Sequence, residues 1–343
     1  MTAPLAPPER RRAAGVGRPA RAGAAIELDV RPPGPYRLPP AGRDGILRRR
    51  RGALVRVLHR DAEEAIVAAW PTSSAVRLHA RAPSADTAAW AIDRMRFALG
   101  VDHDVRPFQR EFSRDPLLAP VIHRKPWIRP QRRPDPFEAL AWAITEQLIE
   151  SERAVRIQRT LTWRFGRRSS CGTLRAAPCA ADLARRCQPE LQACDLSAGR
   201  SLALIKASRE VAAARVDLTQ HEPAWRRLVR IREIGPWTLE KLAFHGQGRD
   251  DQLPAGDLAY IKLVGVVAGL GRRATVEEVR EFYAPYAPYG ALAGLYMLHG
   301  RGFLGAGAAG PMRRAARSPS RAGAPASSGR STSWSDRTAP GGR

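Results

Sequence analysis

Cysteine is scarce in this sequence of 343 residues, and the spacing of its cysteines argues against a common kind of metal site. Cys171, Cys179, Cys187 and Cys194 are separated by seven, seven and six residues. Zinc sites usually contain a pair of ligands with only about two to four residues between them. We therefore expect free thiols and no metal site.

Long apolar runs are also missing. No segment approaches the roughly 20 apolar residues that cross a bilayer. The N-terminal segment MTAPLAPPERRRAAG lacks the apolar core of a signal peptide. We therefore expect a cytoplasmic protein that does not bind membranes.

Lysine and acidic residues are few. Only four of the 57 basic residues are lysine, and 33 acidic residues leave a formal net charge of +24. Residues 1–25 and 304–343 carry +4 and +6 of this charge, which leaves +14 on the rest. An arginine bias also accompanies GC-rich genomes. A net charge of this size nevertheless favours nucleic acid as a partner, because binding to phosphates releases condensed counterions.

Composition divides the chain into four parts. Residues 1–25 and 304–343 are rich in Ala, Gly, Pro, Ser and Arg without periodicity, which predicts disordered basic tails. In residues 26–130, alternating segments such as ALVRVLHR and SAVRLHARA predict strands, and SADTAAWAIDRMRFALG predicts a helix with Ser84 as its N-cap and Gly100 just past its end. Residues 131–303 have a helical pattern almost throughout. The predicted fold class is α+β: a small N-terminal antiparallel β-sheet module with helices, followed by an all-α bundle.

The first helix of the second half lies in DPFEALAWAITEQLIES. Asp135 can cap it, Pro136 suits its first position, and Glu138 completes a capping box. Apolar residues from Phe137 to Leu148 recur at helical spacing and predict one packed face. Further helices are predicted at about residues 152–165, 180–188, 198–214, 222–232, 236–246, 258–269, 275–284 and 289–299.

The segment IREIGPWTLEKLAFHG, residues 231–246, predicts two helices joined by a tight turn. Gly235 can adopt turn conformations that other residues avoid, and Pro236 suits the start of the second helix. N–H groups at that start can bind a phosphate, so the segment is predicted to be a helix-hairpin-helix. In LPAGDLAYIKL, which follows, Asp257 can cap the next helix or serve as a reactive carboxylate.

Together these two segments resemble the helix-hairpin-helix DNA glycosylase superfamily. DPFEALAWAITEQLIES is similar to the family's entry helix, and LQACDLSAGRSLALIKAS to the helix ahead of the hairpin. The β-rich module is similar to that of the alkylation-repair branch, the 3-methyladenine DNA glycosylase II type. The resemblance covers roughly residues 26–303, which implies domains at 26–130 and 131–303 between the two tails.

The resemblance implies roles for individual residues. Asp257 matches the catalytic aspartate. Gln147 and Leu148 match a pair whose leucine fills the gap left by the expelled nucleotide, although Leu148 also fits a core position. The hairpin residues that match those holding the DNA phosphate are Ile234, Gly235 and Thr238.

Trp237, Lys241 and Tyr296 are implied to line the pocket for the damaged base. In branches that also nick the strand, the position of Trp237 is a lysine that forms a Schiff base, so we expect no lyase step. Lys241 replaces an aromatic residue of the alkylation-repair enzymes, and its charge would repel a cationic base. Leu298 replaces a stacking tryptophan, for which Tyr296 or Tyr289 can substitute.

Two further departures concern acidic residues. Glu233 replaces the first glycine of the hairpin and places a negative charge near the expected phosphate. Glu146 and Glu150 flank the Gln-Leu pair in place of small residues.

The function implied is that of a monofunctional DNA glycosylase in base excision repair. It would flip a damaged base, first of all an alkylated purine, out of the duplex and hydrolyse the N-glycosidic bond. Positive charge develops on the sugar, so a carboxylate at Asp257 would stabilise it and activate water. Two alternatives are a glycosylase for oxidised or deaminated bases and a non-catalytic binder of distorted DNA.

The expected partner is double-stranded DNA that contains damaged bases, and we expect the protein to be a monomer. No cofactor is expected. A monovalent cation held by main-chain carbonyls of the hairpin is the one alternative considered.

Overall fold

The computed structural model describes residues 23–302 as a five-stranded sheet followed by helices, which confirms the α+β class. All strand pairs are antiparallel, in the order β1-β5-β4-β3-β2. The strands are β1 Ala24–Val30, β2 Arg48–Arg50, β3 Ala53–Arg60, β4 Glu63–Pro71 and β5 Val76–Ala82. Of the two predicted tails, only residues 23–25 lie within the described range, and Ala24 and Ala25 belong to β1.

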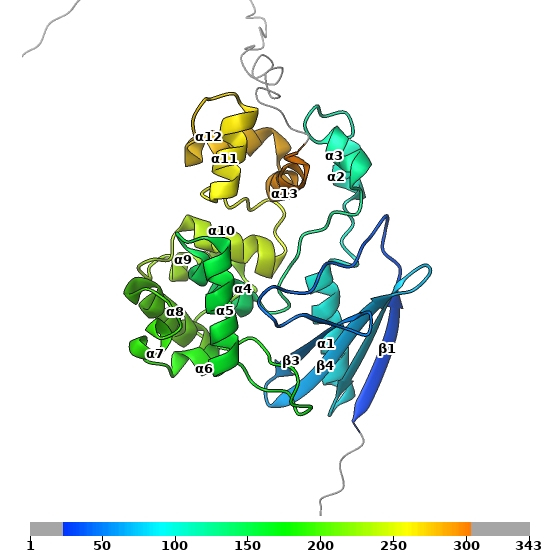
Figure 1. Cartoon of the computed structure of the whole chain (residues 1–343), viewed down its shortest axis with the longest axis vertical. Helices are drawn as coiled ribbons and strands as arrows, with labels where there is room; N and C mark the ends of the chain where they lie inside the picture. Colours follow the sequence, from blue (N-terminus) through cyan, green and yellow to red (C-terminus); the bar gives the residue numbers. More distant parts are fainter. Residues whose placement is uncertain (1–22, 303–343) are drawn as a thin grey trace, which may run out of the picture.

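The helix α1 (Ala85–Leu99) packs on one face of this sheet (Figure 1). The Ser84 hydroxyl accepts a hydrogen bond from the N–H of Thr87, and Gly100 ends the helix at a φ of 63°, as the sequence predicts. Alternate residues of the strands, such as Leu54 and Leu78, meet Met95 of the helix in a shared apolar core. Burial of this face is therefore what fixes the register of the strands.

Twelve further helices follow in the described part of the chain, and those from α4 onward keep the predicted order with shifted ends, except that one predicted helix is divided into α6 and α7. They are α2 Arg106–Glu111, α3 Ala119–Arg124, α4 Pro136–Glu146, α5 Ser151–Phe165, α6 Ala180–Ala184, α7 Gln188–Gln192, α8 Ala198–Ala212, α9 His221–Leu228, α10 Pro236–Leu242, α11 Leu258–Val267, α12 Val276–Tyr283 and α13 Gly290–Gly300. A π-helical turn, η1 Ala243–Gln247, extends α10, and a 3-10 turn, η2 Ala284–Tyr286, follows α12. Within residues 23–302, no helix has both the length and the apolar composition to cross a bilayer.

Two predictions about these helices were wrong. The single helix predicted at 180–188 is two short helices, because Cys187 caps a new start and Pro189 suits the first turn of the second helix. The sequence analysis also missed α2 and α3, which lie in a region rich in proline and arginine. Each is only six residues long, too short for a periodic pattern.

Three large apolar cores organise the described residues, and a small fourth cluster joins Val57 of β3 to Leu174 and Ala176. The sheet and α1 form one core, and helices α4 to α10 form a second. The third core joins α11, α12 and α13 to α2 and α3, so residues 105–128 pack with the C-terminal helices and not with the sheet (Figure 1). The expected division at residue 130 therefore separates segments that share a core.

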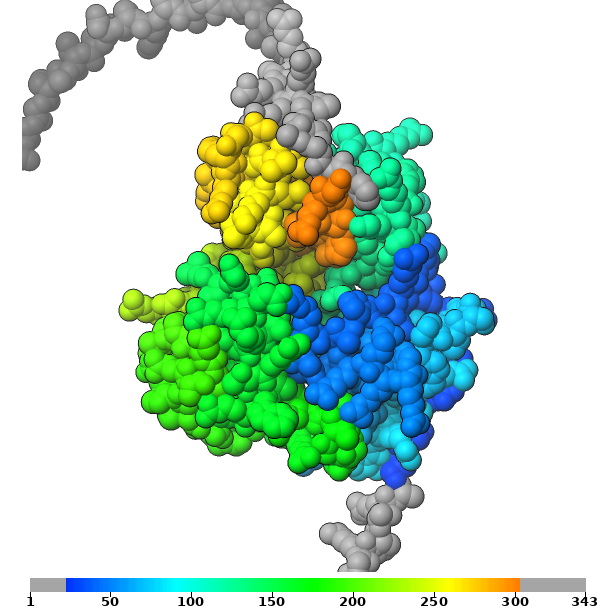
Figure 2. Space-filling model, in the orientation of Figure 1, coloured from blue at the N-terminus to red at the C-terminus, as the bar shows by residue number. Residues whose placement is uncertain are grey.

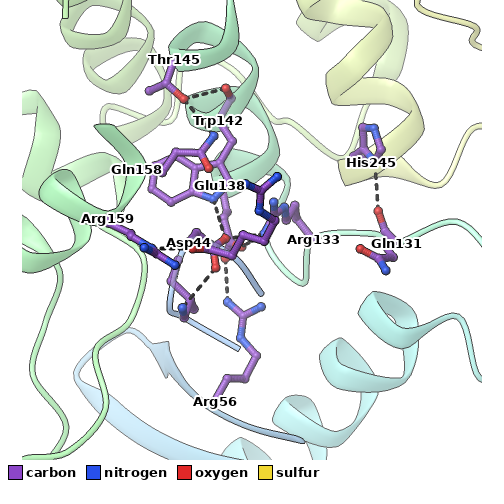
Figure 3. A network of polar contacts seen from close by, with 12 residues as sticks. Asp44, Arg56, Gln131, Arg133, Glu138, Trp142, Thr145, Gln158, Arg159 and His245 are labelled. Carbon is purple, nitrogen blue, oxygen red and sulfur yellow. Dashed lines mark hydrogen bonds and ion pairs between the residues drawn. The ribbon is translucent and has the colours of Figure 1, made fainter. Parts of the chain in front are cut away.

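A buried polar network ties the sheet to α4 (Figure 3). Arg56 of β3 lies 2.7 Å from Glu138 of α4, and their side chains are only 4% and 3% exposed. Arg133 contacts both Glu138 and Asp44, and the indole N–H of Trp142 donates to Asp44. Two arginines and two carboxylates balance in charge, which is what allows them to be buried together.

This network predicts a large effect of removing one partner. Glu138→Gln leaves the buried guanidinium of Arg56 without its charge partner, and we expect a loss of about 3 kcal/mol in the free energy of unfolding, measured with urea. The paired replacement of Arg56 by Met and Glu138 by Leu removes both charges and should recover most of that loss. A cost below about 1 kcal/mol for Glu138→Gln would show that the network does not hold the sheet to α4.

Candidate active site

The hairpin between α9 and α10 turns without help from its glycine. Gly235 has φ −105° and ψ −176°, an extended conformation open to any residue. A Cβ added at Gly235 would meet no atom within 4 Å, so neither strain nor packing inside the protein requires glycine here. The prediction that the turn requires the conformational freedom of Gly235 was therefore wrong. The absence of a side chain at Gly235 only leaves open space at the surface of the hairpin.

The left-handed residue of the hairpin is Glu233, with a φ of 75°. A non-glycine residue rarely adopts this conformation, which costs on the order of 1 kcal/mol. The Glu233 side chain lies over the first turn of α8, where its Oε1 is 2.9 Å from the place a Cβ would occupy on Gly199. The positive end of α8 therefore favours the carboxylate at this position.

Gln147, Ile234 and Thr238 support the hairpin from inside. The Gln147 amide donates to the Glu233 carbonyl and, at 2.8 Å, to the Thr238 hydroxyl. Gln147, Ile234 and Thr238 are all buried. Their side chains are therefore not exposed for direct contact with a partner, and the contact expected of them reduces to holding the main chain of the turn.

Leu148 is the most exposed large apolar residue of the described chain. The helix α4 ends at Glu146, because Arg200 binds the Thr145 carbonyl and the chain turns away at Gln147. Leu148 then adopts a φ of 55° and is fully exposed, at 102% of its reference area. Its predicted place on the packed face of α4 is wrong, because the helix stops before it.

Asp257 begins α11 as its N-cap residue. One carboxylate oxygen accepts a hydrogen bond from the N–H of Ala259 at 3.0 Å. The other lies 4.0 Å from the ammonium of Lys241, and the side chain is 27% exposed. Trp237 packs against Gly256, so α10 borders the loop that carries the carboxylate.

Lys241 connects Asp257 with α4. Its ammonium lies 2.9 Å from Glu146 and 5.5 Å from the centre of the Trp237 ring. The second oxygen of Glu146 accepts a hydrogen bond from Gln158. Two of the departures from the family pattern, Lys241 and Glu146, are therefore partners in one ion pair.

Glu146 and Lys241 both carry their charge at neutral pH. Burial works against the ionised form of Glu146, but Lys241 outweighs it and holds the pKa of Glu146 below its usual value. Burial also works against the charge on Lys241, and Glu146 followed by Asp257 outweighs it and raises the pKa of Lys241. Lys241 is therefore protonated and Glu146 ionised, so the charges of the pair cancel.

A cavity of about 310 Å³ opens beside Lys241, between the loop that contains residues 39–47 and α4. His245, one turn beyond Lys241, lines it, and its Nδ1 lies 2.9 Å from the carbonyl of Gln131 (Figure 3). Burial and then the charge of Lys241 lower the pKa of His245 to about 3, so the imidazole is neutral. Asp257 is not among the lining residues, so Lys241 is what links the cavity to the carboxylate.

Tyr296 does not belong to this group. It is fully buried in the core of the C-terminal helices, where its hydroxyl donates to the Ile128 carbonyl and accepts from Gln109. The prediction that Tyr296 lines the pocket is wrong, because its ring packs edge-on against Phe108 and faces no surface. His245 and Glu146 lie beside Lys241, where Tyr296 was predicted to be. Trp237, Lys241 and His245 are spaced by four residues, and this helical spacing could have identified His245 from the sequence.

Among residues 23–302, no three His, Cys, Asp or Glu side chains are grouped to hold a metal ion. The four cysteines, all within that range, form no disulfide.

Comparisons with known proteins place this geometry in context. No protein-family model matches the chain. The DNA-3-methyladenine glycosylase of Bacillus subtilis (strain 168) is 24% identical over 204 residues, which are 57% of this chain and 67% of that protein. The solved 3-methyladenine DNA glycosylase of Archaeoglobus fulgidus superposes with a TM-score of 0.64 at 22% identity, covering 74% of this chain and 89% of its own.

A solved 8-oxoguanine glycosylase/lyase of Clostridium acetobutylicum, in complex with DNA containing 8-oxoguanine, superposes with a TM-score of 0.59. It is 14% identical and covers 76% of this chain and 89% of its own. The chain therefore has the fold of the helix-hairpin-helix DNA glycosylases, which confirms the resemblance at the level of the fold.

The ion pair of Lys241 and Glu146 predicts a stability that depends on pH. Lys241→Met should lower the free energy of unfolding at neutral pH by about 2 kcal/mol, between the values for exposed and buried pairs. Because Lys241 lowers the pKa of Glu146, its stabilisation is present above the usual glutamate pKa and is lost as the pH falls through the folded-state pKa. The deficit of the variant should therefore shrink under acid.

Urea unfolding across the pH range measures this effect. The double variant Lys241→Met with Glu146→Gln, which leaves no buried charge unpaired, is the control and should show a smaller deficit without that pH dependence. An equal deficit at neutral and acid pH for Lys241→Met would contradict the pairing.

Proposed function

We propose that this protein is a DNA glycosylase that hydrolyses the N-glycosidic bond of damaged bases. The observation that carries the proposal is the carboxylate of Asp257, held by the start of α11 with one oxygen left free beside Lys241. The sequence relation to the Bacillus subtilis enzyme supports the same reaction class. A non-catalytic binder would need Asp257 only as the N-cap of α11 and would have no use for the second oxygen beside Lys241.

In the proposed reaction, the base leaves with the electron pair of its bond to C1′, and positive charge develops on the sugar. Asp257 stabilises that charge and accepts or directs the proton of the attacking water. The hydrogen bond from Ala259 fixes one oxygen, so the carboxylate does not have to reorganise as the charge develops.

Leu148 is the residue that would enter the duplex. An apolar side chain exposed to water and held in a left-handed conformation is costly on both counts, and such costs concentrate at functional sites. Filling the space of an expelled nucleotide would bury that side chain. The amide of Gln147 ties this position to the hairpin, so the apolar wedge and the phosphate contact would act as one unit.

Alkylated purines are the substrates we propose first. The positive charge of Lys241 was expected to repel a cationic base, but Glu146 lies 2.9 Å from it and compensates that charge. A cationic purine becomes a neutral base when it takes the electron pair of the glycosidic bond. It needs no protonation before it leaves, so the reaction requires no strong general acid. Oxidised or deaminated bases are the alternative substrates.

Strand nicking is a second candidate activity, and one observation favours it. Lys241 places an amine 4.0 Å from Asp257, one helical turn beyond the position at which lyases carry theirs. Its ion pair with Glu146 and its raised pKa keep that amine protonated and non-nucleophilic. We therefore propose a monofunctional enzyme.

Asp257→Asn provides the direct test. We expect release of free methylated base from purine-methylated duplex DNA to fall by at least about 100-fold, because the variant keeps the N-cap and loses the charge. Leu258→Asn, on an exposed neighbour, is the matched control and should keep most of the activity. Strand breaks should form in wild type only after alkali.

Two outcomes would contradict the proposal in different ways. Unchanged base release by Asp257→Asn would remove this residue from the reaction. Nicks without alkali, together with a borohydride-trapped adduct that Lys241→Met abolishes, would establish the lyase activity.

Gly235→Ala tests the hairpin as a DNA contact. A Cβ there meets nothing in the protein, so the melting temperature should stay unchanged, whereas a phosphate close to the main chain would be displaced. We expect affinity for a duplex with an abasic-site analogue to fall about tenfold. Gly302→Ala, at another open position, is the control, and equal affinity of both variants would exclude a close approach at Gly235.

A further inference from the structure

A stripe of arginines, all exposed except the half-buried Arg175, runs along α5 and continues onto the edge of the sheet. Arg156, Arg159 and Trp163 follow one another at helical spacing and are all exposed. Beyond the end of α5, the guanidinium of Arg175 lies 4.5 Å from the centre of the Trp163 ring. Arg168 lies in the same loop, and Arg48 and Arg50 lie on β2. We call these six arginines and Trp163 the α5 stripe.

Hydrogen bonds to neutral carbonyls hold the stripe together. Arg159 donates to the carbonyl of Arg43, and Arg175 to that of Gly166. Arg48 and Arg50 of β2 both donate to the carbonyl of Thr173, which holds the edge strand against the loop after α5. These bonds orient the guanidinium groups while leaving their charge uncompensated.

Carboxylates do not neutralise the stripe. Within the described part of the chain, none of its six arginines lies within 4.0 Å of a carboxylate oxygen; Asp195, whose pKa is lowered mainly by Arg153 and to a lesser degree by Arg156, pairs with Arg153. Nearby acids are engaged elsewhere: Glu64 accepts hydrogen bonds from Ser170, and Glu152 pairs with Arg43. Many arginines on other elements do have a carboxylate partner, as Arg77 has Asp29. An arginine-rich composition alone does not explain this grouping.

Trp163 is an exposed aromatic side chain among the arginines of the α5 stripe. It is 69% exposed, and no other aromatic residue among residues 23–302 is classed with the exposed ones. An indole with a guanidinium over its face offers an apolar surface beside a positive charge. Sugar and phosphate groups of a DNA backbone match this combination.

The position of the stripe relates it to Leu148. The helix α5 begins at Ser151, just after Leu148, and its 15 residues extend about 22 Å, the length of roughly six base pairs. Figure 1 shows α5 at the front of the molecule, and Figure 2 shows the green loop after it against the blue strands. The stripe therefore leads away from the proposed wedge on a continuous surface.

We propose that the α5 stripe is a second DNA-binding surface, which holds the backbone of the duplex several base pairs away from the damaged nucleotide. This proposal depends on the proposed function in one respect only, namely that Leu148 enters the duplex at the damaged nucleotide. Fixed guanidinium groups bind phosphates well, since they lose little freedom on binding. Contacts between the α5 stripe and the distant part of the duplex would add affinity and salt dependence without taking part in the chemistry.

The test compares two duplexes that carry an abasic-site analogue, one with about 15 base pairs on each side and one with only about 4, too short to reach the stripe. The variant replaces Arg50, Arg168 and Arg175 by Gln, the arginines of the stripe that lie at or beyond the far end of α5. We expect its affinity for the long duplex at low salt to fall about tenfold and its salt dependence to lose about 2 to 3 in slope. Affinity for the short duplex should not change.

The matched control replaces Arg81, Arg110 and Arg114 by Gln, which removes the same charge from β5, α2 and the residues after α2. Equal melting temperatures of both triple variants would establish that the fold is intact. Two results would overturn the proposal: an equal loss for both duplexes, or a loss no greater than that of the control. Because binding is measured on an uncleavable analogue, failure of base release would leave this test unaffected.

Discussion

The ion pair of Lys241 and Glu146 is the interaction on which the candidate site depends. It joins the second helix of the hairpin to the end of α4, and its ammonium lies within 4.0 Å of Asp257 on α11. Three segments distant in sequence therefore meet at one half-buried charge. Removing either partner would leave the other desolvated, so the pair constrains both the packing of α10 on α4 and the charge beside the carboxylate.

Two of the six non-glycine residues with a positive φ among residues 23–302 lie near the same place. Leu148 and Glu233 both have positive φ values, and the amide of Gln147 connects the two segments by binding the Glu233 carbonyl. A glycine at residue 233 would remove the strain but also the carboxylate that lies over the start of α8. The protein retains a costly turn in which the electrostatics of α8 offset part of the strain.

Sequence reasoning predicted those features that depend on local chemistry. The cap at Ser84, the proline start of α10 and the N-cap role of Asp257 follow from residue types at fixed offsets, and each is present. Sequence reasoning failed where contacts between distant segments determine the structure. The end of α4 depends on Arg200, which lies 55 residues from its partner Thr145, and the burial of Tyr296 depends on α2, which the sequence did not reveal.

Two substitutions that looked unfavourable one at a time compensate each other in three dimensions. A lysine in place of an aromatic residue would place a bare charge in the site, and a glutamate in place of a small residue would bury another, but at 2.9 Å the two are complementary. No spacing rule connects residues 146 and 241, so only the fold could reveal their relation. The charge available to a substrate is therefore that of the pair with Asp257, and a site that contains Lys241 is compatible with a cationic base.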